Sequence, residues 1–180
     1  MAVKEDNFLL GSGDLFIGQV DDPATATEEE IVEALENVGA ISGGAILTYK
    51  PSFQEVKSAN RGTLFTMLTE EEITFKSGLL TWDLANLEKL SAAHYSEDTT
   101  KGERRIGLGG LKQVPVNYLR FVHKKVDGKK LTVNLFRAQN QSGFELTFDG
   151  EKETVLDAEF KALACPGKEQ GNAVEIIEEI

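Results

Sequence analysis

The sequence predicts a mainly β protein, an antiparallel β-sandwich or barrel with one or two flanking α-helices. The first observation is a long run of alternating apolar and polar residues between Val116 and Ala164. Period-two alternation indicates strands with one covered face and one polar face. The second is that only two short segments have helical spacing. The 180 residues are 41% hydrophobic and 27% charged, which suits one domain spanning 1–180 with a core of its own.

The N-terminal part predicts one strand and one helix. Asp14–Val20 is an apolar run that Pro23 and the two aspartates before it interrupt. Thr27 is followed by Glu30 three residues later, which is the pattern of a capping box. We therefore expect a helix from Thr27 to about Asn37.

The next segment predicts four strands, although one stretch is ambiguous. The residues from Thr69 to Glu72 also resemble a capping box, but Ile73, Phe75 and Leu79 have strand spacing. Pro51-Ser52 is expected to form a turn. The strands are expected at Ala40–Lys50, Phe53–Ser58, Gly62–Leu68 and Glu72–Thr81.

A second helix, a loop and a further strand are expected next. Asp83 is placed to cap a helix over Leu84–Ala92. The polar segment Ala93–Glu103 predicts a surface loop. Arg104–Gly110 has the composition of another strand.

The alternating region begins with a hairpin. Val116–Val126 and Lys130–Arg137 are separated by Asp127-Gly128, a dipeptide that suits a two-residue turn. This turn would set Val122 opposite Val133 and Leu119 opposite Phe136, on opposite faces of the hairpin. One face should then meet the core, and the other something outside the monomer.

The tip of this hairpin is basic in an acidic protein, and two interpretations stay open. The lysines could simply face solvent and keep the end of the hairpin from aggregating. It could also dock on an acidic surface of another subunit, such as Glu28–Glu30, Glu70–Glu72 or Glu175–Glu179. The interface candidates here are Lys124, Lys125, Lys129 and Lys130.

Three strands are expected after the hairpin. The first two alternate strictly between apolar and charged or polar residues, and the last is acid-rich. They are expected at Phe144–Asp149, Leu156–Ala162 and Ala173–Ile180.

The charge and the termini exclude several classes of protein. The formal net charge of −11 disfavours nucleic-acid binding, which needs clustered cations. Acidity can reflect solubility, or it can let DNA pass without adhering. There is no apolar run of about 20 residues and no basic, apolar leader, so neither a membrane anchor nor secretion is expected. The single Cys165 fits a reducing compartment.

The chain shows little catalytic equipment. His94 falls in the polar loop and His123 in a strand, and neither has a neighbouring metal ligand at a short spacing. Cys165 has no nearby histidine that could activate it. The glycines of 107–110 lack the lysine and hydroxyl residue of a phosphate-binding loop. We therefore expect no catalytic residue, metal or cofactor.

Four segments resemble those of bacteriophage tail tube (major tail) proteins, of the type found in Gram-positive phages and prophages and related to tubes of contractile tail-like particles. The first matches the opening strand of that family, the second its early hairpin, the third its strand and helix, and the fourth its late strands. The segments are Gly13–Gly18, Gly39–Tyr49 with Phe53–Ser58, Leu79–Leu90, and Phe121–Phe148 followed by Val155–Ala164.

The resemblance implies a structural subunit without enzymatic activity, which assembles in the bacterial host cytoplasm and resides in the virion tail. Hexameric rings would stack into a hollow conduit through which DNA passes, with tape measure, sheath or baseplate proteins as further partners. A long loop or hairpin would connect the rings, and the candidates are the turn at Pro51 and Ser52 and the loop Ala93–Glu103. The candidates for lumen-facing carboxylates are Glu145, Asp157 and Glu159.

Two other functions remain open. A small β-sandwich that binds a receptor or carbohydrate would need an exposed aromatic platform. The one tryptophan, Trp82, precedes a helix cap and is expected to be structural. A carboxylate-dependent hydrolase would need a concave acidic pair that no pattern reveals.

Overall fold

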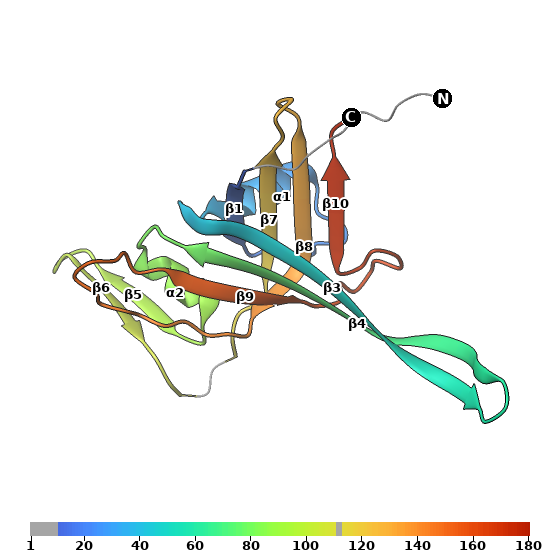
Figure 1. The fold of residues 1–180 in the computed structure, drawn as a ribbon. Helices are drawn as coiled ribbons and strands as arrows, with labels where there is room; N and C mark the ends of the chain where they lie inside the picture. Colours follow the sequence, from blue (N-terminus) through green and yellow to red (C-terminus); the bar gives the residue numbers. More distant parts are fainter. Residues whose placement is uncertain (1–10, 111–112) are drawn as a thin grey trace.

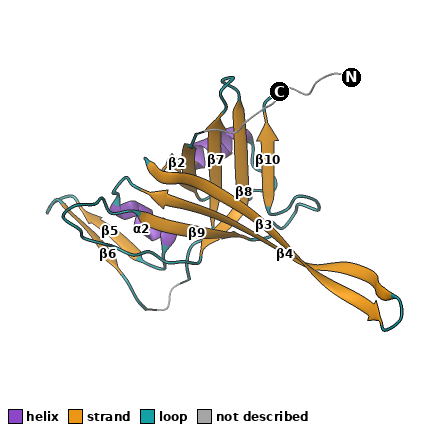
Figure 2. Ribbon diagram, viewed as in Figure 1, coloured by secondary structure: helices purple, strands orange, loops and turns teal. Residues whose placement is uncertain are grey.

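The computed structural model describes residues 11–110 and 113–180, which form an antiparallel β-sandwich with two flanking helices, as Figures 1 and 2 show. The predicted fold class is confirmed. The elements are β1 (Gly13–Gly18), α1 (Glu28–Ala34), β2 (Leu35–Asn37), β3 (Ile41–Ser58), β4 (Gly62–Leu79), α2 (Leu84–Leu90), β5 (His94–Asp98), β6 (Glu103–Gly107), β7 (Asn117–Lys124), β8 (Lys130–Asn140), β9 (Leu156–Ala162) and β10 (Val174–Glu178).

One continuous sheet supplies both layers of the sandwich. Its strand order is β2-β1-β7-β8-β9-β4-β3, and β10 also pairs with β8. The long β8 is the bend: residues 131–135 pair with β7 and β10, whereas residues 138–140 pair with β9. Figure 1 accordingly shows β3 and β4 crossing in front of β7 and β8.

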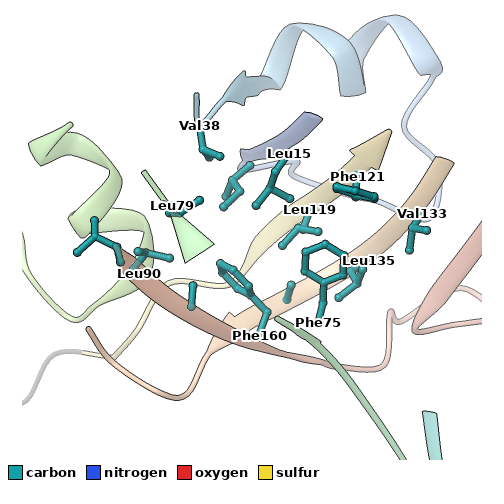
Figure 3. Packing of buried hydrophobic residues seen from close by; sticks show 14 of the residues in the cluster. Leu15, Val38, Phe75, Leu79, Leu90, Leu119, Phe121, Val133, Leu135 and Phe160 are labelled. Atoms are coloured by element: carbon teal, nitrogen blue, oxygen red, sulfur yellow. The ribbon is translucent and has the colours of Figure 1, made fainter. Parts of the chain in front are cut away.

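The core lies between these layers. Leu15 of β1 and Leu119 of β7 face Phe75 of β4 and Phe160 of β9, and all four are at most 1% exposed. Figure 3 shows how these side chains converge. Helix α2, capped by the Asp83 carboxylate on the Ala85 N–H, adds Leu87 and Leu90 to the core.

Helix α1 covers the outer face of the β1–β7–β8 layer. Its predicted capping box is present, because Thr27 accepts from the Glu30 N–H and Glu30 accepts from the Thr27 N–H. The helix ends at Ala34 rather than near Asn37 because the next residues pair with β1 as strand β2. A second apolar cluster forms beneath it from Ile31, Tyr118, Phe136 and Cys165.

The predicted register of the β7–β8 hairpin is wrong by one residue. The Lys125 N–H donates to the Lys129 carbonyl over 2.8 Å, which closes a three-residue connection that ends at Gly128 with φ 86°. A turn of three residues instead of two shifts the pairing, so that Val133 faces Phe121 instead of Val122. Leu119 likewise faces Leu135 and not Phe136.

The outer face of this hairpin is also apolar, as predicted, but it is not left for a partner outside the monomer. Tyr118 and Phe136 are buried beneath α1 and the segment around Cys165. This part of the face is therefore covered within the subunit, and the predicted external partner is not needed there.

Pro51-Ser52 is not a turn, which is a second correction. Both residues lie inside one 18-residue strand, β3, where Pro51 pairs with Glu71 of the equally long β4. The turn lies at residues 59–61 and is followed by Gly62 with φ 73°. Proline fits here because β3 is an edge strand, where a missing N–H is tolerated.

Two further expectations fail. The segment Ala93–Glu103 is largely a hairpin and not a loop, because β5 pairs with β6 and sets Tyr95 opposite Ile106. Phe144–Asp149 forms no strand, although β8 pairs only with Phe160–Ala162 on that side of β9. The Glu159 N–H there donates to the side chains of Asn140 and Ser142 and not to a further strand. Phe144 and Leu146 still pack against the core.

Candidate assembly surface

The β3–β4 hairpin extends beyond the rest of the protein. β9 pairs with β4 only from Thr74 to Leu79, so residues 49–73 continue as a two-stranded ribbon that we call the arm. Figure 1 shows the arm projecting away from both layers of the sandwich. At about 3.3 Å per residue, its strands reach roughly 30 Å.

The arm carries large apolar side chains that nothing in the described chain covers. Phe53 is 58% exposed and Phe65 is 60% exposed. Two-stranded ribbons are marginally stable alone, and contiguous exposed apolar residues indicate an interaction site. Of the sixteen exposed large apolar residues within 11–110 and 113–180, seven lie in the arm, which makes it the main candidate interface. They are Tyr49, Phe53, Val56, Leu64, Phe65, Met67 and Leu68.

The pairing distributes these side chains over both faces of the arm. Phe53 pairs with Leu68, and Val56 pairs with Phe65. Because side chains alternate along a strand, Phe53 and Val56 point to opposite faces. An apolar surface on both sides suits insertion between two neighbours better than contact with one flat surface.

Polar contacts preserve the shape of the arm without covering it. The Tyr49 hydroxyl donates to the Glu71 carboxylate over 2.8 Å, and this bond raises the pKa of Tyr49. Thr69 donates to the Ser52 carbonyl over 3.1 Å beside an irregularity in the ladder. Pro51 and Ser52, both predicted interface candidates, lie near the base of the arm, and their role in an interface stays a prediction.

The four predicted lysines lie at the β7–β8 tip but differ in their contacts. Lys125 Nζ is 2.9 Å from a Glu178 carboxylate oxygen, and this bond raises the pKa of Lys125. The Lys130 N–H donates to the Glu179 carboxylate over 2.8 Å. Lys124 and Lys129 are exposed and form no ion pair with any residue of 11–110 or 113–180. The C-terminal acidic segment therefore contacts the ammonium group of Lys125 and the backbone of Lys130 within the same subunit.

The proposed lumen carboxylates do not form a single acidic surface. Asp157 and Glu159 lie on the face of β9 that points away from the core, whereas Glu145 lies in the irregular segment before it. Glu159 is 2.9 Å from Lys76. The outer face of β9 is thus of mixed charge.

The remaining candidates for chemistry are dispersed. His94 is exposed on β5, while His123 is buried and its Nδ1 lies 2.7 Å from the Ser12 carbonyl. Cys165 is buried in the second apolar cluster. Within the described ranges, no three metal-ligating side chains come together, and no helix is long and apolar enough to cross a membrane.

Some surface features were missed or misjudged at the level of sequence. The aromatic and aliphatic residues of 53–68 were recognised as strand residues but not as an exposed set. The high apolar content of this hairpin, for which the sequence predicts no third strand, is the signal that could have identified an exposed apolar surface. Trp82 is 55% exposed, so the expectation that it packs as a structural residue is wrong.

Comparison with known proteins adds little beyond the fold. No known family matches the sequence, and no curated protein matches it. Among solved structures, the chain is similar to one from the tail of an empty GTA particle, computed with helical refinement and C6 symmetry. The two are 9% identical, with a TM-score of 0.46 over 92% of this chain and 96% of the other. A likeness of this extent supports no conclusion about function.

Proposed function

We propose that this protein is the structural subunit of a phage or phage-like tail tube. In this proposal six subunits form each ring, and the rings stack into a hollow conduit for DNA. The resemblance of four sequence segments to tail tube proteins supports the assignment. The subunit has no enzymatic role, and its partners are copies of itself and other tail proteins.

The observation that carries the proposal is the uncovered arm. Its half-exposed aromatic and aliphatic side chains contribute on the order of 1 kcal/mol each when a neighbour covers them. Because these residues recur on both faces, one arm can contact two neighbouring subunits. A free monomer gains nothing from such a surface, whereas an assembled tube does.

The sheet edges support self-assembly as well. β2 and β3 end the main path of the sheet, and each presents a strand edge to solvent in the isolated subunit. Open edges favour pairing with further strands, and closed rings remove them. The net charge of −11 suits a wall that does not retain DNA.

Negative-stain electron microscopy over a concentration series, with light scattering after size exclusion, tests the proposal. We expect rings or stacked tubes above a threshold concentration. A protein that stays monomeric at every concentration and binds a glycan would replace this function with the binding-module alternative.

A further inference from the structure

The C-terminal strand β10 is attached to the protein mainly through its backbone. It pairs with β8 from Val174 opposite Leu135 to Glu178 opposite Leu131. Ile176 is 58% exposed and Ile177 is 48% exposed, so their side chains contribute little packing. Only Val174 of this strand packs against the core. A strand held in this way is released at low cost compared with a core strand.

One ion pair and several hydrogen bonds to backbone groups hold the end of β10 at the basic tip. Lys125 Nζ contacts the Glu178 carboxylate and also donates to the Glu179 carbonyl over 3.2 Å. Lys130 exchanges two bonds with Glu179, through its N–H to the carboxylate at 2.8 Å and through its carbonyl to the Glu179 N–H at 3.0 Å. The acidic strand and basic tip are thus matched in charge as well as in hydrogen bonding.

The segment before β10 can act as a hinge. Cys165 is buried and anchors its start, and the Cys165 N–H donates to the Asn172 carbonyl over 2.7 Å. Gly167 and Gly171 between them have φ of 89° and 56°. If the loop opened, residues 166–173 could span roughly 25 Å when extended.

We propose that β10 is an exchangeable strand: in the assembled tube, the β8 edge at Leu131–Leu135 binds residues 174–179 of a second copy of this chain. This inference rests on the proposed tube function and names one of its contacts. The exchanged strand makes the same ladder and the same Lys125 and Lys130 contacts as in the monomer, so exchange is close to neutral locally. Assembly raises the effective concentration of the neighbouring strand and connects the subunits.

Two single-cysteine proteins, Val133→Cys and Ile176→Cys, both carrying Cys165→Ala, test the exchange. Val133 and Ile176 are directly opposite. The backbone bonds Glu179 N–H to Lys130 carbonyl and Phe136 N–H to Ala173 carbonyl fix the alternation of the ladder. Val133 and Ile176 are therefore a non-hydrogen-bonded pair, whose Cα atoms lie close enough for a disulfide.

The two proteins are mixed, assembled and mildly oxidised, and denaturing gels are run without reductant. We expect a reducible dimer band that needs both variants and accompanies the assembled fraction. The matched control is Val133→Cys with Ile176→Cys in one chain, which forms an internal disulfide in the monomer.

The outcomes separate the two proposals. Tubes without the dimer band, with the control disulfide forming normally, overturn strand exchange and leave the tube function intact. Absence of rings and tubes by microscopy in the unmodified protein overturns the tube function, and strand exchange with it.

Discussion

Arg120 and Glu28 join the sheet to helix α1 across 92 positions of sequence. Arg120 Nη2 donates to Glu28 Oε2 over 2.9 Å, a second guanidinium nitrogen contacts Oε1, and Arg120 Nε donates to Asn134 over 2.8 Å. The Arg120 side chain is 11% exposed and that of Glu28 is 68% exposed. The Glu28 carboxylate, which lies in the solvent-exposed first turn of α1, therefore neutralises an Arg120 guanidinium group that is largely buried.

Replacing Glu28 should destabilise the fold. Glu28→Gln removes the carboxylate that faces Arg120, and we expect a loss of about 1 kcal/mol in the free energy of unfolding at neutral pH, since the exposed carboxylate is partly screened. Glu29→Gln is the matched control because Glu29 is in the same helical turn and is exposed. Urea unfolding of both variants measures the difference, and equal losses would contradict a specific role for the pair.

The same pair predicts a pH dependence. The Arg120 hydrogen bond, together with its charge, lowers the pKa of Glu28 below the ordinary 4.5. A lowered carboxyl pKa means that its stabilisation is present above pH 4.5 and is lost as the pH falls through the lowered value. The stability gap between the unmodified protein and Glu28→Gln should thus stay constant from neutral pH to about 5 and shrink in stronger acid. A gap that widens in acid would contradict this assignment.

Gly18 permits the close crossing of β1 and the end of α1. A Cβ at Gly18 would lie 1.9 Å from the Ala34 carbonyl oxygen. We expect Gly18→Ala to lower the free energy of unfolding by about 1–3 kcal/mol, because backbone must move to relieve the overlap. Gly150→Ala is the control, since a Cβ at Gly150 meets nothing within 4 Å. Comparable thermal melts for the two variants would refute the steric argument.

The sequence predicted those parts of the fold that depend on neighbouring residues along the chain. The Thr27–Glu30 box and the Asp83 cap each depend on atoms within one helical turn, so both helix starts were predicted correctly. Strand alternation likewise predicted β7, β8 and β9, because it depends only on which face is covered.

Features that depend on contacts between segments far apart in the sequence could not be predicted from it. Pro51 is a turn signal locally, yet it lies in a strand because β3 is at an edge of the sheet. The β7–β8 register depends on whether Val126 belongs to the strand or the turn. Phe144–Asp149 alternates like a strand, but the side chains of Asn140 and Ser142, and not a further strand, accept from the Glu159 N–H of β9. For the assembly surface, sequence identified the basic tip and named Glu175–Glu179 among its candidate partners, but in another subunit, whereas Lys125 contacts Glu178 within the same subunit.

Lys124 and Lys129 of the basic tip should contribute to assembly. Lys124→Glu with Lys129→Glu removes two cations that form no ion pair in the described chain, so we expect tube yield to fall while the thermal melt of the subunit is unchanged. For a matched control, the single variant Lys129→Glu is compared with Lys152→Glu, which changes the net charge equally at an exposed position outside the tip. If these two single variants assemble alike, only the overall charge matters and the tip is not an interface.

The arm yields the most direct prediction for assembly. Phe53→Ser with Phe65→Ser removes two large side chains that are 58% and 60% exposed, so the subunit should melt as before. If neighbours bury both rings, the loss is roughly 2–3 kcal/mol per subunit, which raises the threshold concentration for assembly by about 30–150-fold. Phe148→Ser is the matched control, because Phe148 is 88% exposed but lies outside the arm. Phe53→Leu with Phe65→Leu should retain most assembly, since it keeps an apolar surface. Tubes from the serine variant at the unmodified protein's threshold, measured by light scattering and microscopy, would show that the arm is not the contact between subunits.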